Sequence, residues 1–337
     1  MTDNVLAGRR RGNAMRRVVC REFTEPPTLD VLDEPTPEPG PGEVLVEVDS
    51  VAVAFVDGLI TAGRYQLRPP LPFTPGSGVA GRVVALGDGV ASPAIGTTVA
   101  VLLANDFGGF ASHVVVPAEA VAAIPEGVDP DIAASTLENY GTVLFAVTQR
   151  VTIASGDWVV VLGAGGGIGQ AAIDVARSLG ARVVAVASTE EKRAAAAAAG
   201  AEVTLGYDDL KNRIRDATGG GADVVLDPVG GPAAESALRA LDGGGRFCVV
   251  GFTSGEIPRL PANIVLLRNR TVVGVDWGDW ARNDTAAAVS LASEVLARIG
   301  SGELHPSSPR VLGLDEASAA LELLAGRQVT GKIVLRP

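Results

Sequence analysis

Cysteine and histidine are scarce in this chain of 337 residues. Cys20 and Cys248 are too few for a disulfide framework or for a four-cysteine zinc lobe, and they fit a protein of the reducing cytoplasm. His113 lies in an apolar, strand-like stretch and His305 in a polar loop. We therefore expect no metal ion to be bound, because a catalytic zinc needs three protein ligands beside its open position.

Positive charge and long apolar runs are lacking as well. The net charge is −11, which argues against nucleic acid or an anionic membrane surface as the main partner. No apolar run approaches the roughly 18 residues of a membrane helix, and no signal-peptide core follows the early arginines. We expect a cytoplasmic protein of two domains, because the chain is longer than a single hydrophobic core usually allows.

Glycine, in contrast, is abundant, and its densest stretch lies at residues 163–169. The apolar run 158–162 before it has the composition of a strand buried on both faces, 170–179 has helical spacing, and 182–187 is a second apolar run. A strand, a glycine turn and a helix form a phosphate-binding unit, because backbone amides at the helix start face the negative charge of a pyrophosphate. The turn residues predicted to bind the cofactor are Gly163, Ala164, Gly165, Gly166, Gly167, Ile168 and Gly169. The alternative is a glycine-rich turn without a ligand in a generic α/β domain.

The end of the second strand indicates which dinucleotide is bound. Sites for NAD usually carry a carboxylate about 20 residues past the glycines, which accepts from the ribose 2′-hydroxyl. Ala187 stands at this strand end, Ser188 follows and Lys192 comes soon after. Ser188 could donate to a 2′-phosphate and Lys192 could supply charge, so NADPH is the predicted cofactor. The alternative is that Lys192 pairs with Glu190 or Glu191 at a solvated helix start.

The remaining patterns divide the chain. Residues 1–14 have no periodicity and are predicted to be a flexible tail, whereas 15–134 show alternating strands between Gly and Pro turns and are predicted to form a barrel-like β domain. Residues 135–277 alternate strands with helices, which predicts an α/β domain with a doubly wound, six-stranded parallel sheet. Within 278–337 we expect a helix over 283–299 and a closing strand over 331–335 that returns to the first domain.

This order of domains, and a set of short motifs, resemble the zinc-independent quinone oxidoreductase (zeta-crystallin-like) branch of the medium-chain dehydrogenase/reductase superfamily. The motifs are 55–57 (Phe-Val-Asp), 63–65 (Gly-Arg-Tyr), 72–77 with 79–81, 109–111, 140–142 (Tyr-Gly-Thr), 227–231 (Asp-Pro-Val-Gly-Gly) and 331–335. The resemblance implies a GroES-like catalytic domain followed by a Rossmann domain that binds NADPH. It also implies a homodimer, in which the sixth strand pairs with its copy across a two-fold axis.

Site residues follow from the same resemblance. It implies catalytic roles for Tyr140, as hydrogen-bond donor or proton relay to the acceptor, and for Thr142, as part of the nicotinamide pocket. The alternative for Tyr140 is packing at the domain junction. Further cofactor contacts are implied for Tyr207, Phe252, Val275, Trp277 and Lys332, and a substrate pocket for Ala54, Phe55, Leu59, Tyr65 and Gly78.

Several positions depart from the patterns of the superfamily. Zinc-dependent relatives have a cysteine where Ala54 stands and Gly-His-Glu at 76–78, whereas this chain has Gly-Ser-Gly there. Members of the quinone branch usually have asparagine at Ala54, often tyrosine at Leu59 and an acid at Gly78. Each change removes a polar group, so we expect a roomier and more apolar acceptor pocket.

The resulting hypothesis is an NADPH-dependent oxidoreductase that transfers a hydride to a quinone or an α,β-unsaturated carbonyl without zinc. A second hypothesis is an enoyl-thioester or enone reductase of a biosynthetic pathway. A third is a protein that binds NADPH without turnover and serves as a binding partner.

Overall fold

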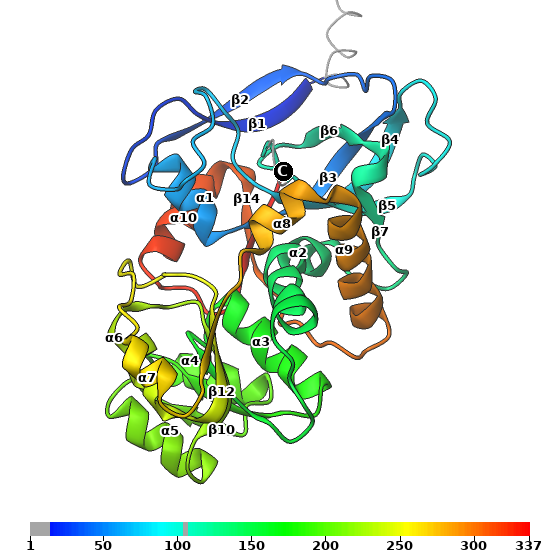
Figure 1. The fold of residues 1–337 in the computed structure, drawn as a ribbon. Coiled ribbons are helices and arrows are strands. Elements are labelled where there is room, and N and C mark those ends of the chain that lie inside the picture. The colour runs from blue at the N-terminus through cyan, green and yellow to red at the C-terminus, as the bar shows by residue number, and fades with distance from the viewer. Residues whose placement is uncertain (1–13, 104–106) are drawn as a thin grey trace, which may run out of the picture.

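The computed structural model describes residues 14–103 and 107–337, so the predicted flexible tail lies outside the described residues except for Ala14. Two lobes follow one another along most of the chain, and Figure 1 shows the first in blue and cyan above the second in green and yellow. Within the described ranges no helix is both long enough and apolar enough to cross a membrane.

The first lobe is built on a seven-stranded sheet with strand order β14-β15-β3-β4-β5-β7, in which β6 also pairs with β3. Its strands are β3 (Glu43–Val53), β4 (Gly78–Leu86), β5 (Thr98–Leu102), β6 (His113–Pro117), β7 (Val121–Ala123), β14 (Arg310–Gly313) and β15 (Ile333–Arg336). Alternate valines of β3, among them Val44, Val46 and Val48, are buried in its core, as their period of two predicts. A short helix, α1 (Phe55–Thr61), follows β3 directly, and α10 (Ala317–Ala325) packs against it.

The second lobe contains the predicted six-stranded parallel sheet, with strand order β10-β9-β8-β11-β12-β13. Its strands are β8 (Trp158–Leu162), β9 (Arg182–Val186), β10 (Val203–Leu205), β11 (Ala222–Asp227), β12 (Leu241–Val249) and β13 (Thr271–Gly274). The helices that alternate with them are α3 (Gly167–Ser178), α4 (Glu190–Ala198), α5 (Leu210–Thr218), α6 (Gly231–Ala240) and α7 (Ala262–Leu266).

Successive valines of β8 separate the two faces of this sheet. Val159 and Val161 pack in the core that contains residues of α3, while Val160 packs in the core that contains residues of α5 and α6. Helices therefore cover both faces, which confirms the doubly wound arrangement.

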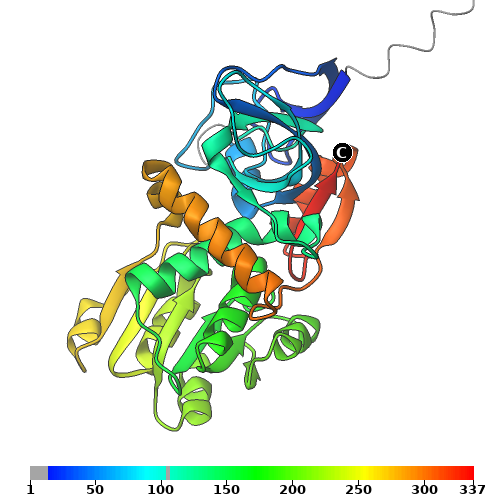
Figure 2. The same cartoon turned by 90° about the vertical axis from the view of Figure 1, so that its right-hand side faces the viewer.

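The two lobes meet along α2 (Pro130–Phe145) and α9 (Thr285–Gly300). Helix α2 contacts β3, β4 and β5 of the first lobe and α3 of the second, and Figure 2 shows the orange α9 running beside the same junction. The predicted domain boundary at 134/135 falls within α2, which belongs to both hydrophobic cores. The expected closing strand is β15, which pairs antiparallel with β3 and so returns the chain to the first lobe.

Two local features differ from the expectations. The helix expected over 283–299 is preceded by a separate helix, α8 (Trp277–Asn283), and Asp284 begins α9 by accepting a hydrogen bond from the amide of Ala287. Residues 26–41 are rich in proline, yet they contain an unexpected strand, β2 (Leu29–Pro35), which pairs antiparallel with β1 (Ala14–Cys20).

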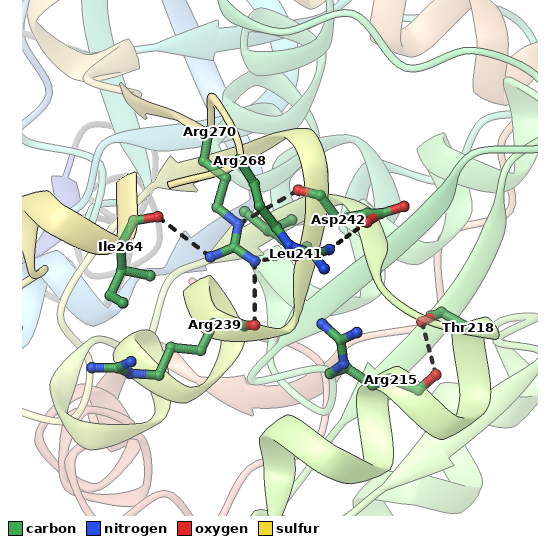
Figure 3. Close-up of polar contacts among 8 residues, drawn as sticks. All are labelled: Arg215, Thr218, Arg239, Leu241, Asp242, Ile264, Arg268 and Arg270. Atoms are coloured by element: carbon green, nitrogen blue, oxygen red, sulfur yellow. Dashed lines mark hydrogen bonds and ion pairs between the residues drawn. The ribbon is translucent and has the colours of Figure 1, made fainter. Parts of the chain in front are cut away.

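Arg270 closes the carboxyl end of α6, at the edge of the parallel sheet where its strands begin. Its guanidinium donates to the carbonyl oxygens of Ile264 and Arg239 at 3.4 Å, and also to those of Leu241 and Asp242 (Figure 3). Burial and three nearby arginines lower the pKa of Arg270. The last carbonyls of a helix lack intrahelical donors, so this one side chain supplies what the backbone cannot.

Candidate active site

The glycine turn lies between β8 and α3, as predicted, and its geometry excludes side chains. A Cβ atom on Gly169 would lie 2.3 Å from the carbonyl oxygen of Gly163, well inside van der Waals contact. On Gly165 a Cβ would lie 2.6 Å from the Cβ of Lys192, and on Gly167 it would lie 2.6 Å from the Cδ of Lys332. Two lysine stems therefore lie directly against the turn, that of Lys192 at Gly165 and that of Lys332 at Gly167.

A cavity of about 580 Å³ runs along this turn. Its lining comes from both lobes, from α2 and from the segment that leads into β15. Of the predicted site residues, those that line it are Phe55, Gly163, Gly165, Gly166, Gly167, Ile168, Gly169, Ser188, Lys192, Tyr207 and Lys332. Ala164 does not, since it is fully buried and its amide donates to the carbonyl of Val186.

Polar side chains gather at the part of the cavity formed by the ends of β9 and β10. The hydroxyl of Tyr207 accepts a hydrogen bond of 3.1 Å from the amide of Gly163, and burial raises the pKa of this phenol. The ammonium of Lys192 donates to the carbonyl of Arg327 at 2.7 Å, and it makes no ion pair with Glu190, which binds Arg193 instead. Ser188 lines the same region.

Arg327 is a site residue that the sequence did not reveal. It lines the cavity, and its guanidinium donates to the carbonyls of Thr253 and Ser254 at 3.1 Å each. Arg327 is 135 residues from Lys192 in the sequence, and only the return of the chain through β15 brings the two together. The nearby Gly331-Lys332 motif was the signal that could have drawn attention to this segment.

The part of the cavity toward the first lobe is lined by Val53 and Phe55, by Glu138 and Asn139 of α2, and by Lys332. The Asn139 amide donates to the carbonyl of Gly167 at 3.2 Å, which ties α2 to the start of α3. The Lys332 ammonium lies 3.7 Å from the Glu138 carboxylate. Glu138 and Asn139 were not among the predicted site residues.

Asp57 lies near this region at the start of α1. It is fully buried, and its carboxylate accepts hydrogen bonds from the amides of Ala54 (2.8 Å) and Gly76 (3.2 Å). Burial raises the pKa of Asp57 to about 7; the negative charge of Glu138 adds to this effect, while both amides and the charge of Lys332 oppose it. This carboxyl group therefore titrates in the neutral range.

Tyr140 is placed differently from its expected role. It does not line the cavity; it is 3% exposed and belongs to the core of the second lobe. Its hydroxyl donates to the buried carboxylate of Asp174 at 2.8 Å, and burial together with Asp174 raises the pKa of Tyr140 far above its usual range. This geometry does not support proton delivery by Tyr140 and instead agrees with the alternative of packing at the junction. Thr142, two residues on, is buried and does not line the cavity either.

The other predicted site residues do not line the cavity. Ala54 and Gly78 are buried, while Leu59 and Tyr65 are half-buried. Burial raises the pKa of Tyr65, and the negative charges of Asp276 and Glu138 add to the effect. Val275 and Trp277 are buried in the core of the second lobe, and Phe252 is exposed on the surface beside Thr253 and Ser254, which do line the cavity. Among the residues that the structure describes, no three His, Cys, Asp or Glu side chains cluster as metal ligands would.

Comparison with known proteins places this site in a family. The chain is 34% identical over 334 residues to quinone oxidoreductase-like protein 2 of Rattus norvegicus, which covers 98% of this chain and 94% of the rat protein. The chain belongs to the zinc-independent quinone oxidoreductase branch of the medium-chain dehydrogenase/reductase superfamily. Family models agree with the two lobes of this superfamily: residues 40–126 match the alcohol dehydrogenase GroES-like domain, and 167–294 match a model described as zinc-binding dehydrogenase.

Two further proteins are similar to this chain. The quinone oxidoreductase from Thermus thermophilus, whose structure was also solved as a complex with NADPH, has a TM-score of 0.82 and 34% identity, covering 96% of this chain and all of that one. A mycocerosic acid synthase-like polyketide synthase of Mycobacterium tuberculosis is 33% identical over 306 residues, which span 88% of this chain but only 14% of the synthase.

Proposed function

We propose that this medium-chain reductase uses NADPH to deliver a hydride to a quinone or an α,β-unsaturated carbonyl, without zinc. The observation that carries the proposal is the cavity along the glycine turn, which is lined by Lys192 and Arg327 in one part and by Val53 and Phe55 in the part toward the first lobe. Relatives at the family level include a quinone oxidoreductase solved with NADPH.

The residues present fit NADPH. The glycine turn leaves no room for side chains, so a pyrophosphate can approach the first amides of α3. Ser188, Lys192 and Arg327 supply a hydroxyl and two positive charges where the 2′-phosphate of the adenosine ribose would lie, and no carboxylate follows Ala187 directly. When bound, the nicotinamide supplies the hydride, while the protein positions it and excludes water.

The part of the cavity lined by Val53 and Phe55 is the proposed acceptor end. Its residues favour a substrate that is electrophilic without activation by a metal ion. Ala54 and Gly78 stand where zinc-dependent relatives have ligands, so the described site offers no Lewis acid from protein-held metal. A quinone or an enone needs none, because its double bond is conjugated to a carbonyl. Phe55 and Val53 provide an apolar wall for such a planar acceptor.

The second candidate, reduction of an enoyl thioester or another enone in a biosynthetic pathway, is supported by the likeness to part of a polyketide synthase. Removal of polar side chains at Ala54, Leu59 and Gly78 agrees with an acceptor oriented by shape and not by hydrogen bonds.

Calorimetry with both coenzymes, followed by NADPH oxidation with a panel of quinones and enones, tests the proposal. One or two charge-assisted hydrogen bonds to the 2′-phosphate should make NADPH bind about 10- to 100-fold more tightly than NADH. Turnover of quinones supports the first candidate, and turnover of enones alone supports the second. Binding of NADPH with no turnover of any acceptor would overturn both and favour a non-catalytic binding protein.

We also propose a homodimer formed through β13, the last strand of the six-stranded sheet. Val272 of this strand is 38% exposed, and Leu266 and Leu267 just before it are 76% and 59% exposed. An unpaired apolar edge favours pairing with a second copy. Sedimentation velocity should show a dimer for the natural chain and a monomer for Val272→Lys; a monomeric natural chain would contradict the proposal.

A further inference from the structure

Glu138 and Lys332 meet across the junction of the two lobes, inside the cavity. Glu138 lies on α2, and Lys332 immediately precedes β15. The Lys332 ammonium is 3.7 Å from Oε2 of Glu138, and the side chains of Lys332 and Glu138 are only 13% and 27% exposed. Both line the cavity.

The Lys332 ammonium is free for a ligand. Among the described residues it makes no hydrogen bond, since its distance to Glu138 is that of an ion pair without one. Its aliphatic stem packs against Gly167 at the start of α3, which fixes the direction of the side chain. A cation held by a carboxylate, with its protons unused, is suited to give one of them to a bound molecule.

Other ionisable groups are badly placed for this task. Asp57 is fully buried, does not line the cavity, and its carboxylate accepts hydrogen bonds from two backbone amides. The remaining ionisable side chains that line the cavity are Lys192, Tyr207 and Arg327, and these lie at the end where the 2′-phosphate is proposed to bind. Tyr140 is bound to Asp174 in the core. Glu138, by contrast, lines the cavity together with Val53 and Phe55, in the part toward the first lobe.

We propose that Lys332 is the proton donor of the reduction and that Glu138 is the residue that positions it. This proposal rests on the proposed NADPH-dependent reduction. After the acceptor has taken up the hydride with its electron pair, its oxygen carries the negative charge of an enolate or a hydroquinone anion. An N–H bond of the Lys332 ammonium breaks and its proton forms an O–H or C–H bond on the acceptor. The amine left on Lys332 then takes a proton from water. Solvent has access to this ion pair, because the side chain of Glu138 is 27% exposed.

The experiment compares Lys332→Gln, Lys332→Arg and Glu138→Gln with Lys211→Gln, a matched control at an exposed lysine of α5. For each, the dissociation constant of NADPH is measured by calorimetry, and kcat at saturating NADPH is measured in H2O and in D2O. Loss of a general acid should lower kcat of Lys332→Gln about 100-fold or more. The solvent isotope effect should increase, the NADPH dissociation constant should change less than about threefold, and Lys211→Gln should behave as the natural chain.

The other variants separate proton donation from charge. Lys332→Arg keeps the positive charge but releases no proton at the working pH, so its kcat should stay as low as that of Lys332→Gln. Glu138→Gln should lower kcat about 10-fold with a larger solvent isotope effect, because the ammonium loses the carboxylate that holds it.

Three results would overturn the proposal while leaving the reductase activity intact: full activity in Lys332→Gln, recovery of activity in Lys332→Arg, or a weakened NADPH affinity whose saturation restores kcat. The last would show that Lys332 is only a cofactor ligand. If the natural chain itself turns over no acceptor, the proposed function fails first, so the two failures are distinguishable.

Discussion

In the second lobe, helix ends differ between the edge of the parallel sheet where the strands begin and the edge where the strands end. Where the strands begin, the carboxyl end of α6 is closed by the chain itself, because Arg270 donates to the backbone carbonyls of Arg239 and Leu241 there (Figure 3). Where the strands end, the amino end of α3 borders a cavity of about 580 Å³. At one edge the helix carbonyls are satisfied within the chain, whereas at the other the first amides of α3 face a cavity in which a ligand can bind them.

We call the edge where the strands end and α3 borders the cavity the open edge, and the edge where the strands begin the closed edge. Gly169→Val, at the open edge, should have the largest effect. Its Cβ would lie 2.3 Å from the Gly163 carbonyl oxygen, which is backbone and cannot rotate away. We expect NADPH affinity to fall at least about 100-fold and the free energy of unfolding to fall by about 3 kcal/mol. Calorimetry and urea unfolding measure both. The control is Gly243→Ala at the opposite edge, where a Cβ meets nothing closer than 3.8 Å; an equal loss in both variants would contradict the explanation.

Arg270→Ala, at the closed edge, should lower the stability of the protein without changing its affinity for NADPH. Removal of the guanidinium leaves the carbonyls of Arg239 and Leu241 at the end of α6, and that of Ile264 in α7, without this donor, which should lower the free energy of unfolding by about 2 to 3 kcal/mol. Arg268→Ala removes an exposed ion pair with Asp242 and should cost less than about 1 kcal/mol. Urea unfolding gives both values, and NADPH affinity should be unchanged in each; a cofactor defect in Arg270→Ala would show that the two edges are coupled.

The buried carboxyl of Asp57, at the start of α1, should make the free energy of unfolding depend on pH. Burial raises its folded pKa from 3.8 to about 7, so the folded chain binds the proton more tightly than the unfolded chain does. The stability gained from that proton is complete below the unfolded pKa and is lost as the pH rises through about 7. Between pH 6 and 8 the natural chain should lose about 1.4 kcal/mol relative to Asp57→Asn. Parallel curves of unfolding free energy against pH for the two proteins would refute this origin.

Lys192→Gln should have a smaller effect, confined to the part of the cavity at Lys192 and Arg327. The loss of one charge beside the proposed 2′-phosphate should weaken NADPH binding about 10-fold and leave NADH binding unchanged. Titration of each coenzyme by fluorescence provides the measurement. An equal loss for both coenzymes would place Lys192 at the pyrophosphate, over Gly165, and not at the ribose.

The open edge was predictable from the sequence because its signals are local. The turn at 163–169, the strands on both sides and Ser188 with Lys192 all lie within about one βαβ unit, where spacing alone fixes their relation. The six strands of the sheet and the closing strand β15 followed from apolar runs of the right length. Strand β2 did not, because pairing with β1 overrides the prolines that surround it.

The remaining parts of the site depend on contacts between distant segments. Nothing near Tyr140 in the sequence announces that Asp174, 34 residues on, accepts a hydrogen bond from its hydroxyl. Arg327 and Glu138 reach the cavity only because the chain returns through β15 and because α2 spans both lobes. Such tertiary pairings carry no periodic pattern that a single sequence could display.

The attachment of the C-terminal segment to the glycine turn has a mechanical consequence. The amide of Gly331 donates to the carbonyl of Gly165 at 2.8 Å, and β15 begins two residues later, hydrogen-bonded to β3. Strand β3 in turn leads directly into Phe55. The glycine turn and the segment that leads into Phe55 are therefore joined by hydrogen bonds through Gly331, β15 and β3, so a displacement of the turn would be expected to act on Phe55 as well.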